Sequence, residues 1–198
     1  LKIAKNAHII CLGRFTAINV HFEPIEDVFG AIVILGNNRS SLFRCSFLNG
    51  HGIKQKILQD YPIFSELLPY SNFEYNKKTY KTRPKTKLAG ALVCENTEVL
   101  ECSFHDCNSS SNGGSIVALR SFIKKTEFIN SHTKGKGGAI FGKENYVQEC
   151  SFIDCFAEDS GGAISGNNKI FHCSFIRCSA KESGGAIFEN NQTPSNSI

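Results

Sequence analysis

The chain has 198 residues, a net charge of +4 and 41% hydrophobic residues, which is enough for one packed domain. It contains no run of about 18 apolar residues, so no segment is expected to insert into a membrane. Residues 50–88 hold eight Lys or Arg and three Asp or Glu, a local charge of +5 that leaves −1 for the rest. Because the chain begins at Leu1 and contains no Met, we expect a fragment of a longer protein.

A repeated spacing runs through the chain and is clearest at residues 113–187. The second glycines of four Gly-Gly pairs are 24, 24 and 23 residues apart, at Gly114, Gly138, Gly162 and Gly185. Each follows a phenylalanine by ten residues, at Phe104, Phe128, Phe152 and Phe175. A fixed period of this length is typical of proteins built from stacked repeats.

Taken in chain order, the repeat gives six aligned copies, of which the first, residues 9–22, is the least regular. The second-glycine column is Gly30, Gly90, Gly114, Gly138, Gly162 and Gly185. The aliphatic column is Ile32, Leu92, Ile116, Ile140, Ile164 and Ile187. Three further columns start Phe15–Leu42–Val99, Ile18–Cys45–Cys102 and Val20–Phe47–Phe104. A glycine kept in one slot indicates a turn where a Cβ would clash with its neighbour or where φ is positive.

The short apolar stretches are β-branched and are separated by Gly, Asn and Ser, which favours strands over helices. Cys150 and Phe152 should face inward and Ser151 outward, because side chains alternate along a strand. One period is too short for strand–helix–strand crossovers. The sequence therefore predicts an all-β fold, a right-handed parallel β-helix of about six coils, as a single domain over residues 1–198.

The repeat is interrupted once, by an insertion at residues 50–88. The apolar spacing from Ile53 to Leu68 is typical of a helix, although Pro62 interrupts it. The following segment is rich in basic residues and tyrosine and predicts an exposed loop. Its candidate ligand-binding residues are Tyr75, Lys77, Lys78, Tyr80, Lys81, Arg83, Lys85 and Lys87. We expect an acidic glycan or acidic partner there, nucleic acid being less favoured; the alternative is a loop that only keeps the rod soluble.

Nine cysteines leave three interpretations open. The pairs Cys102/Cys107, Cys150/Cys155 and Cys173/Cys178 repeat a Cys-x4-Cys spacing, which lacks the closer pairs or converging histidines of a zinc site, so no metal is expected. Disulfides between adjacent coils, such as Cys150 with Cys173 or Cys155 with Cys178, agree with the spacing of neighbouring strands. Thr126 shares the cysteine column, however, and this favours a column of small packed side chains.

The sequence offers few candidate catalytic residues that the repeat would bring close together. Asp106 and Asp154 occupy the same slot two rungs apart, at the outer limit for a glycosidase acid/base pair. His51 lies in Gly-His-Gly-Ile, which resembles the histidine motif of polygalacturonases, with Glu26 and Asp27 about one coil earlier. The other motifs of that family are absent. A column of alternating charge, Arg44, Glu101, Lys125, Glu149 and His172, is expected to be a solvated strand face.

At its paired motifs the chain resembles the polymorphic-membrane-protein repeat family of chlamydial and protist surface proteins, which are pectate-lyase-like β-helices. The Gly-Gly-Ala-Ile string is intact at 137–140, 161–164 and 184–187, while the asparagine of that family's Phe-x-x-Asn string is Cys or Ser here. The resemblance implies a non-catalytic protein, without cofactor, that acts in adhesion at the cell surface or after secretion. Its partner would be an acidic glycan or a host receptor. The alternative is a carbohydrate-active enzyme acting on acidic polysaccharide.

Overall fold

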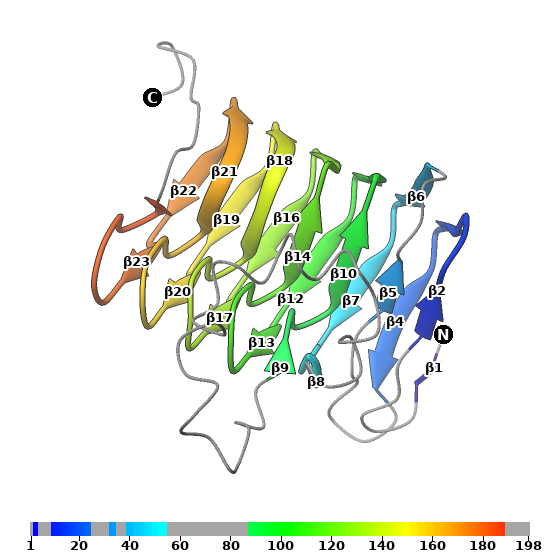
Figure 1. Cartoon of the computed structure of the whole chain (residues 1–198), viewed down its shortest axis with the longest axis horizontal. Coiled ribbons are helices and arrows are strands. Elements are labelled where there is room, and N and C mark those ends of the chain that lie inside the picture. Colours follow the sequence, from blue (N-terminus) through cyan, green and yellow to red (C-terminus); the bar gives the residue numbers. More distant parts are fainter. Residues whose placement is uncertain (1, 4–8, 25–31, 35–38, 55–86, 189–198) are drawn as a thin grey trace, which may run out of the picture.

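The computed structural model describes residues 2–3, 9–24, 32–34, 39–54 and 87–188. The described residues form strands that wind into a right-handed parallel β-helix, with rungs stacked along its long axis (Figure 1). The predicted fold class is therefore confirmed. No helix is found in the described part of the chain. None of its residues belongs to a helix long and apolar enough to cross a membrane.

Three parallel sheets form the walls of the helix. The seven-stranded sheet contains, in order, β1 (Lys2–Ile3), β4 (His21–Pro24), β7 (Ser46–Leu48), β12 (Ser103–His105), β16 (Glu127–Ile129), β19 (Ser151–Ile153) and β22 (Ser174–Ile176). The four-stranded sheet contains β13 (Asn108–Ser109), β17 (His132–Thr133), β20 (Phe156–Ala157) and β23 (Ser179–Ala180).

The largest sheet carries two strands per rung in its earlier part. One series comprises β2 (Ile9–Cys11), β5 (Ile32–Ile34), β10 (Leu92–Glu95) and β14 (Ile116–Leu119). The other comprises β3 (Thr16–Ile18), β6 (Ser40–Phe43), β11 (Thr97–Leu100) and β15 (Phe122–Lys124). Both series pair with the long strand β18 (Ile140–Gln148), which is followed by β21 (Ile164–Phe171) and β24 (Ile187–Phe188).

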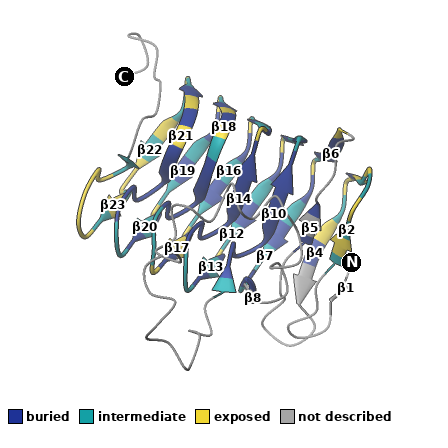
Figure 2. Cartoon of the chain, in the orientation of Figure 1, coloured by how far each residue is buried: buried dark blue, intermediate teal, exposed yellow. Residues whose placement is uncertain are grey.

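The core consists of columns of inward-facing side chains that run along the axis of the β-helix, as predicted from the alternation of side chains along each strand. Figure 2 shows buried residues along most of the central rungs. Phe47, Phe104, Phe128 and Phe152 are fully buried, and their ring centroids are 4.5, 5.1 and 4.9 Å apart with nearly parallel planes. The register also pairs Leu92 with Ile116. Each side chain therefore packs against the rung above and the rung below, and one rung alone would lack both neighbours.

The two glycines of each pair have different reasons to be glycine. A Cβ at Gly138 would lie 1.8 Å from the carbonyl oxygen of Gly162 on the next rung. Gly137 has φ of +70°, a left-handed conformation that glycine adopts without steric cost, and a Cβ there would lie 2.2 Å from the carbonyl oxygen of Ile140 on its own rung. The first slot nevertheless holds Ala89, at φ 47°. In the second slot, every described glycine that is followed by another rung would place a Cβ 1.8–2.2 Å from a backbone oxygen of that rung.

The alignment of the first copy was wrong by two residues. Ala17, and not Phe15, pairs with Leu42, and Phe22, and not Val20, pairs with Phe47. A shift of two residues keeps the same side chains on the inward face, so alternation alone could not detect it. The stack of Phe22 on Phe47, with centroids 4.7 Å apart, fixes the true register.

The column of alternating charge does not form a strand face. Arg44, Glu101, Lys125, Glu149 and His172 all have φ between 49° and 54° and occupy the corners between strands. Arg44 pairs with Glu101 at 2.9 Å, as the alternation of charge suggested. Glu149, however, is bound by Lys124 at 3.2 Å. The corner places these side chains in solvent, but the backbone there is left-handed, which the sequence pattern did not reveal.

Most of the insertion, residues 55–86, lies outside the described residues. Its two ends lie side by side, because β8 (Ile53–Lys54) pairs antiparallel with β9 (Lys87–Leu88). The predicted helix-like segment therefore begins with a strand at Ile53 and Lys54, where pairing with β9 replaces helical hydrogen bonds. The register continues across the insertion, since Phe47 pairs with Phe104.

Candidate functional site

The outer face of β11, β15, β18 and β21 carries an axial row of side chains of mixed chemistry. Successive rungs place Glu98, Phe122, Tyr146 and Lys169 opposite one another. The row arises from the same alternation of side chains that builds the core, because the residues that directly follow Glu98, Phe122 and Tyr146 point inward and are buried. These buried residues are Val99, Ile123 and Val147. We call this row, with the groove beside it, the aromatic face.

Tyr146 is the most exposed aromatic side chain of this face, at 44%. Its hydroxyl accepts a hydrogen bond from Nζ of Lys169 at 3.1 Å, and the ammonium also lies 4.9 Å from the ring centroid. The ring of Phe171 lies nearly parallel to that of Tyr146, with centroids 6.4 Å apart. These contacts hold one flat apolar ring against the sheet with a cation beside it, which is an arrangement suited to stacking on a ligand.

A groove of about 780 Å³ follows the aromatic face. Its lining residues are Arg39, Glu98, Arg120, Ser121, Phe122, Glu144, Tyr146, Asn167 and Lys169. Three of these are cationic and two anionic, a net charge of +1. Arg39 and Glu98 are 3.4 Å apart, and Arg120 contacts the nearly buried Glu95 at 2.5 Å. Arg39, Glu98 and Arg120 are thus held in place by ion pairs, whereas Lys169 contacts Tyr146.

The sequence reasoning missed this face. The signal was present, because Phe122 and Tyr146 are 24 residues apart and Lys169 follows after 23, at the period of the repeat. Of the residues that had been predicted to bind ligand, only Lys87 lies in the described part. It belongs to β9, where its side chain is half-buried and its backbone N–H donates to Oγ of Ser110 at 2.8 Å. The other seven, at positions 75–85, lie outside the described residues.

The suggested acid pair occupies corners of the β-helix. Asp106, Asn130 and Asp154 follow one another on successive rungs, each with φ between 52° and 54°. Nδ2 of Asn130 donates to Asp106 at 2.6 Å. Arg177 binds Asp154 through two hydrogen bonds, 2.6 and 2.7 Å long, and thereby lowers the pKa of this carboxyl. A general acid needs a raised pKa, so this contact favours a structural role for Asp154.

His51 lies at the start of the insertion and is half-buried. Its pKa is lowered, chiefly because burial disfavours the charged ring and further because Lys87 is near. Glu26 and Asp27, the acids about one coil earlier in the sequence, lie outside the described residues. No acid–histidine pair can therefore be placed at this position.

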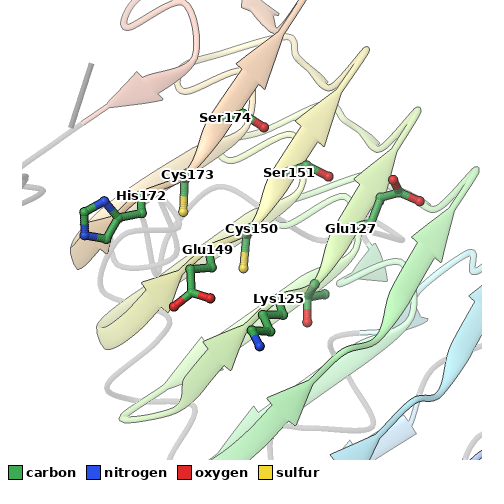
Figure 3. Close-up of a pocket in the computed structure, with 9 residues that line it drawn as sticks. Lys125, Glu127, Glu149, Cys150, Ser151, His172, Cys173 and Ser174 are labelled. Carbon is green, nitrogen blue, oxygen red and sulfur yellow. The ribbon is translucent and has the colours of Figure 1, made fainter.

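A second groove, of about 500 Å³, lies at the corner before β16, β19 and β22. Figure 3 shows Cys150 and Cys173 one above the other with their sulfur atoms on the same side, and Lys125, Glu149 and His172 beside them. All nine cysteines are free thiols. Among the described residues no group of three or more His, Cys, Asp or Glu is arranged to hold a metal ion.

No protein-family model, curated protein or solved structure matches the chain. The fold and the residues of its faces are therefore the basis on which a function can be argued.

Proposed function

We propose that this chain is a non-catalytic binding rod, and that the aromatic face binds a linear, acidic polysaccharide. The exposed ring of Tyr146, between Phe122 and Lys169, is the observation that carries the proposal. Aromatic rings stack on the apolar faces of sugars, and ammonium or guanidinium groups pair with carboxylate or sulfate. Because the rungs repeat along the axis, such positions recur in the direction in which a polymer chain extends.

The resemblance to polymorphic-membrane-protein repeats supports display of this rod at a cell surface and a role in adhesion. The binding face would then contact a glycan of the host or of the surrounding matrix. The basic segment at 75–87 would add a second, salt-sensitive contact to the same polyanion. A pectate-lyase-like ancestry is compatible with this proposal, because a β-helix can keep a polysaccharide groove without catalytic acids.

Binding can be measured by titrating the recombinant chain with polygalacturonate and with heparin. We expect Tyr146→Ala to weaken binding about tenfold, or about 1.4 kcal/mol. Phe156→Ala is the matched control, because Phe156 is a partly exposed ring on β20, in a different sheet. Equal affinities for the two variants would contradict the proposed face. Release of reducing or unsaturated ends from polygalacturonate would contradict the absence of catalysis.

A further inference from the structure

Six of the nine cysteines lie opposite another cysteine on the neighbouring rung. The three pairs are Cys45 with Cys102, Cys150 with Cys173, and Cys155 with Cys178. Ser151 pairs with Ser174, and the N–H of Ser174 donates to the carbonyl of Cys150 at 3.0 Å. The N–H of Ser179 likewise donates to the carbonyl of Cys155 at 3.0 Å. The last two pairs therefore stand at the two ends of the strand pair β19–β22.

The rung before them separates these thiols from the other cysteines. Thr126 occupies the position that corresponds to Cys150 and Cys173, and Ser131 the position that corresponds to Cys155 and Cys178. From this rung to the C-terminal end of the described β-helix, each of these two columns therefore contains one pair of adjacent cysteines. Neighbouring rungs are about 4.8 Å apart. Disulfides join Cα atoms that are roughly 4.4–6.8 Å apart. The register thus brings each pair within bonding range and leaves one choice of partner.

The two thiols of each pair differ in environment. Cys150 and Cys155 are buried, whereas Cys173 and Cys178 are partly exposed. Burial and the neighbouring sulfur raise the pKa of Cys150, while the hydrogen bond from Cys150 lowers the pKa of Cys173. In the same way the pKa of Cys178 falls to about 7, chiefly through its hydrogen bond with Cys155. The accessible member of each pair is thus the better nucleophile.

We propose that Cys150–Cys173 and Cys155–Cys178 are inter-rung dithiols that oxidise to two disulfides and so fix β22 to β19. The oxidant is a low-molecular-weight disulfide such as oxidised glutathione. The thiolate of Cys173 attacks one glutathione sulfur and releases the other as a thiolate. Cys150, on losing its proton, attacks the Cys173 sulfur and releases the second glutathione. Two electrons pass from the cysteines to the oxidant, and the two protons pass to the glutathione thiolates; Cys178 and Cys155 react in the same way.

The pairing can be read by peptide mapping of the intact chain. The protein is equilibrated with oxidised glutathione, its remaining thiols are alkylated, and it is cut with trypsin and an enzyme that cleaves before aspartate. Trypsin separates Cys173 from Cys178 at Arg177, and the second enzyme separates Cys150 from Cys155 at Asp154. The four cysteines then lie on four peptides. We expect links between 150 and 173 and between 155 and 178, each with a loss of two hydrogen masses.

Cys173→Ser provides the matched variant. It should lose the 150–173 link and keep the 155–178 link, while Cys94, which is buried and faces no cysteine, stays free in both proteins. The oxidised parent should also be cut more slowly at Lys181 than the reduced parent under native conditions. Full alkylation of all nine thiols after oxidation would overturn the proposal, and so would crossed links between 150 and 178 or between 155 and 173.

Discussion

Asn145 donates a hydrogen bond from Nδ2 to Oδ1 of Asn168 at 2.8 Å, between two rungs and inside the β-helix, where both side chains are 1% exposed. Oδ1 of Asn145 also accepts the backbone N–H of Ser121 at 2.9 Å, and its Nδ2 also contacts the carbonyl oxygen of Ala118. One amide thus satisfies polar groups on the rung before it and on the rung after it. Buried polar groups left without such partners cost free energy, so this side chain links rungs as well as filling space.

Replacing Asn145 with alanine should therefore destabilise the fold more than its volume suggests. The N–H of Ser121 would lose its acceptor in the interior, and we expect a loss of ~2–3 kcal/mol in the free energy of unfolding. Urea unfolding followed by circular dichroism measures this change. Asn167→Ala is the control, because Asn167 is exposed and should change stability by less than ~0.5 kcal/mol. Similar losses in the two variants would contradict the role of the buried amide.

Gly138 and Gly185 provide a second matched pair. Alanine at Gly138 would place its Cβ 1.8 Å from a backbone oxygen of the next rung, whereas the Cβ position at Gly185 has no atom within 4 Å. We expect Gly138→Ala to cost more than ~3 kcal/mol or to prevent folding, because backbone must move. Gly185→Ala should fold with nearly parental stability. Thermal unfolding compares the two, and a stable Gly138→Ala protein would show that the rungs can separate locally.

The contact of Arg177 with Asp154 predicts a dependence of stability on pH. The pKa of Asp154 is lowered in the folded protein from an ordinary value of 3.8. Such a group contributes stability above pH 3.8, and the contribution is lost as pH falls through the folded pKa. Asp154→Asn should therefore be less stable than the parent near neutral pH, and the difference should vanish in stronger acid. Both groups are exposed, so the effect should be small and should shrink in high salt. A difference that grows on acidification would contradict this assignment.

Removing the basic segment separates its role from that of the aromatic face. The deletion should cover residues 75–86, since Lys87 belongs to β9 and supports the base of the insertion. It removes five cations, and binding to heparin at low salt should weaken and lose most of its salt dependence. The strand spectrum in the far ultraviolet should be unchanged. Parental heparin affinity and salt dependence after deletion would show that the segment does not contribute to binding.

Much of the architecture could be predicted from the sequence because the repeat is regular after residue 90. There the Gly-Gly pairs and phenylalanines fix both the period and the inward face, and the observed register agrees, for example between Phe128 and Phe152. In the first copy the landmarks are missing. Phe15, Val20 and Phe22 all have the inward parity, and only packing against Phe47 selects Phe22.

The left-handed corners and the aromatic face could not be predicted from the sequence, for two different physical reasons. A left-handed corner is recognisable when it holds Gly, Asn or Asp, but Arg44, Lys125 and Glu149 adopt it because the surrounding rungs impose it. The aromatic face is an axial row, so its members are distant in sequence. It becomes visible only when the outward positions are aligned as carefully as the inward ones.

Glu144 explains why the spacing of the second glycines falls from 24 to 23 residues in the last of the four Gly-Gly repeats. It has φ of 58° and interrupts the pairing of β18 with β21, so that Lys143 faces Asn167 and Asn145 faces Asn168. The next rung has no equivalent residue, and its period is 23 in place of 24. One residue was therefore gained or lost at an outer corner while every inward column stayed aligned. A loop added in place of Glu144 should leave the fold intact as long as Asn145 keeps its position, and because Glu144 lines the groove, such a loop would change what the aromatic face can bind.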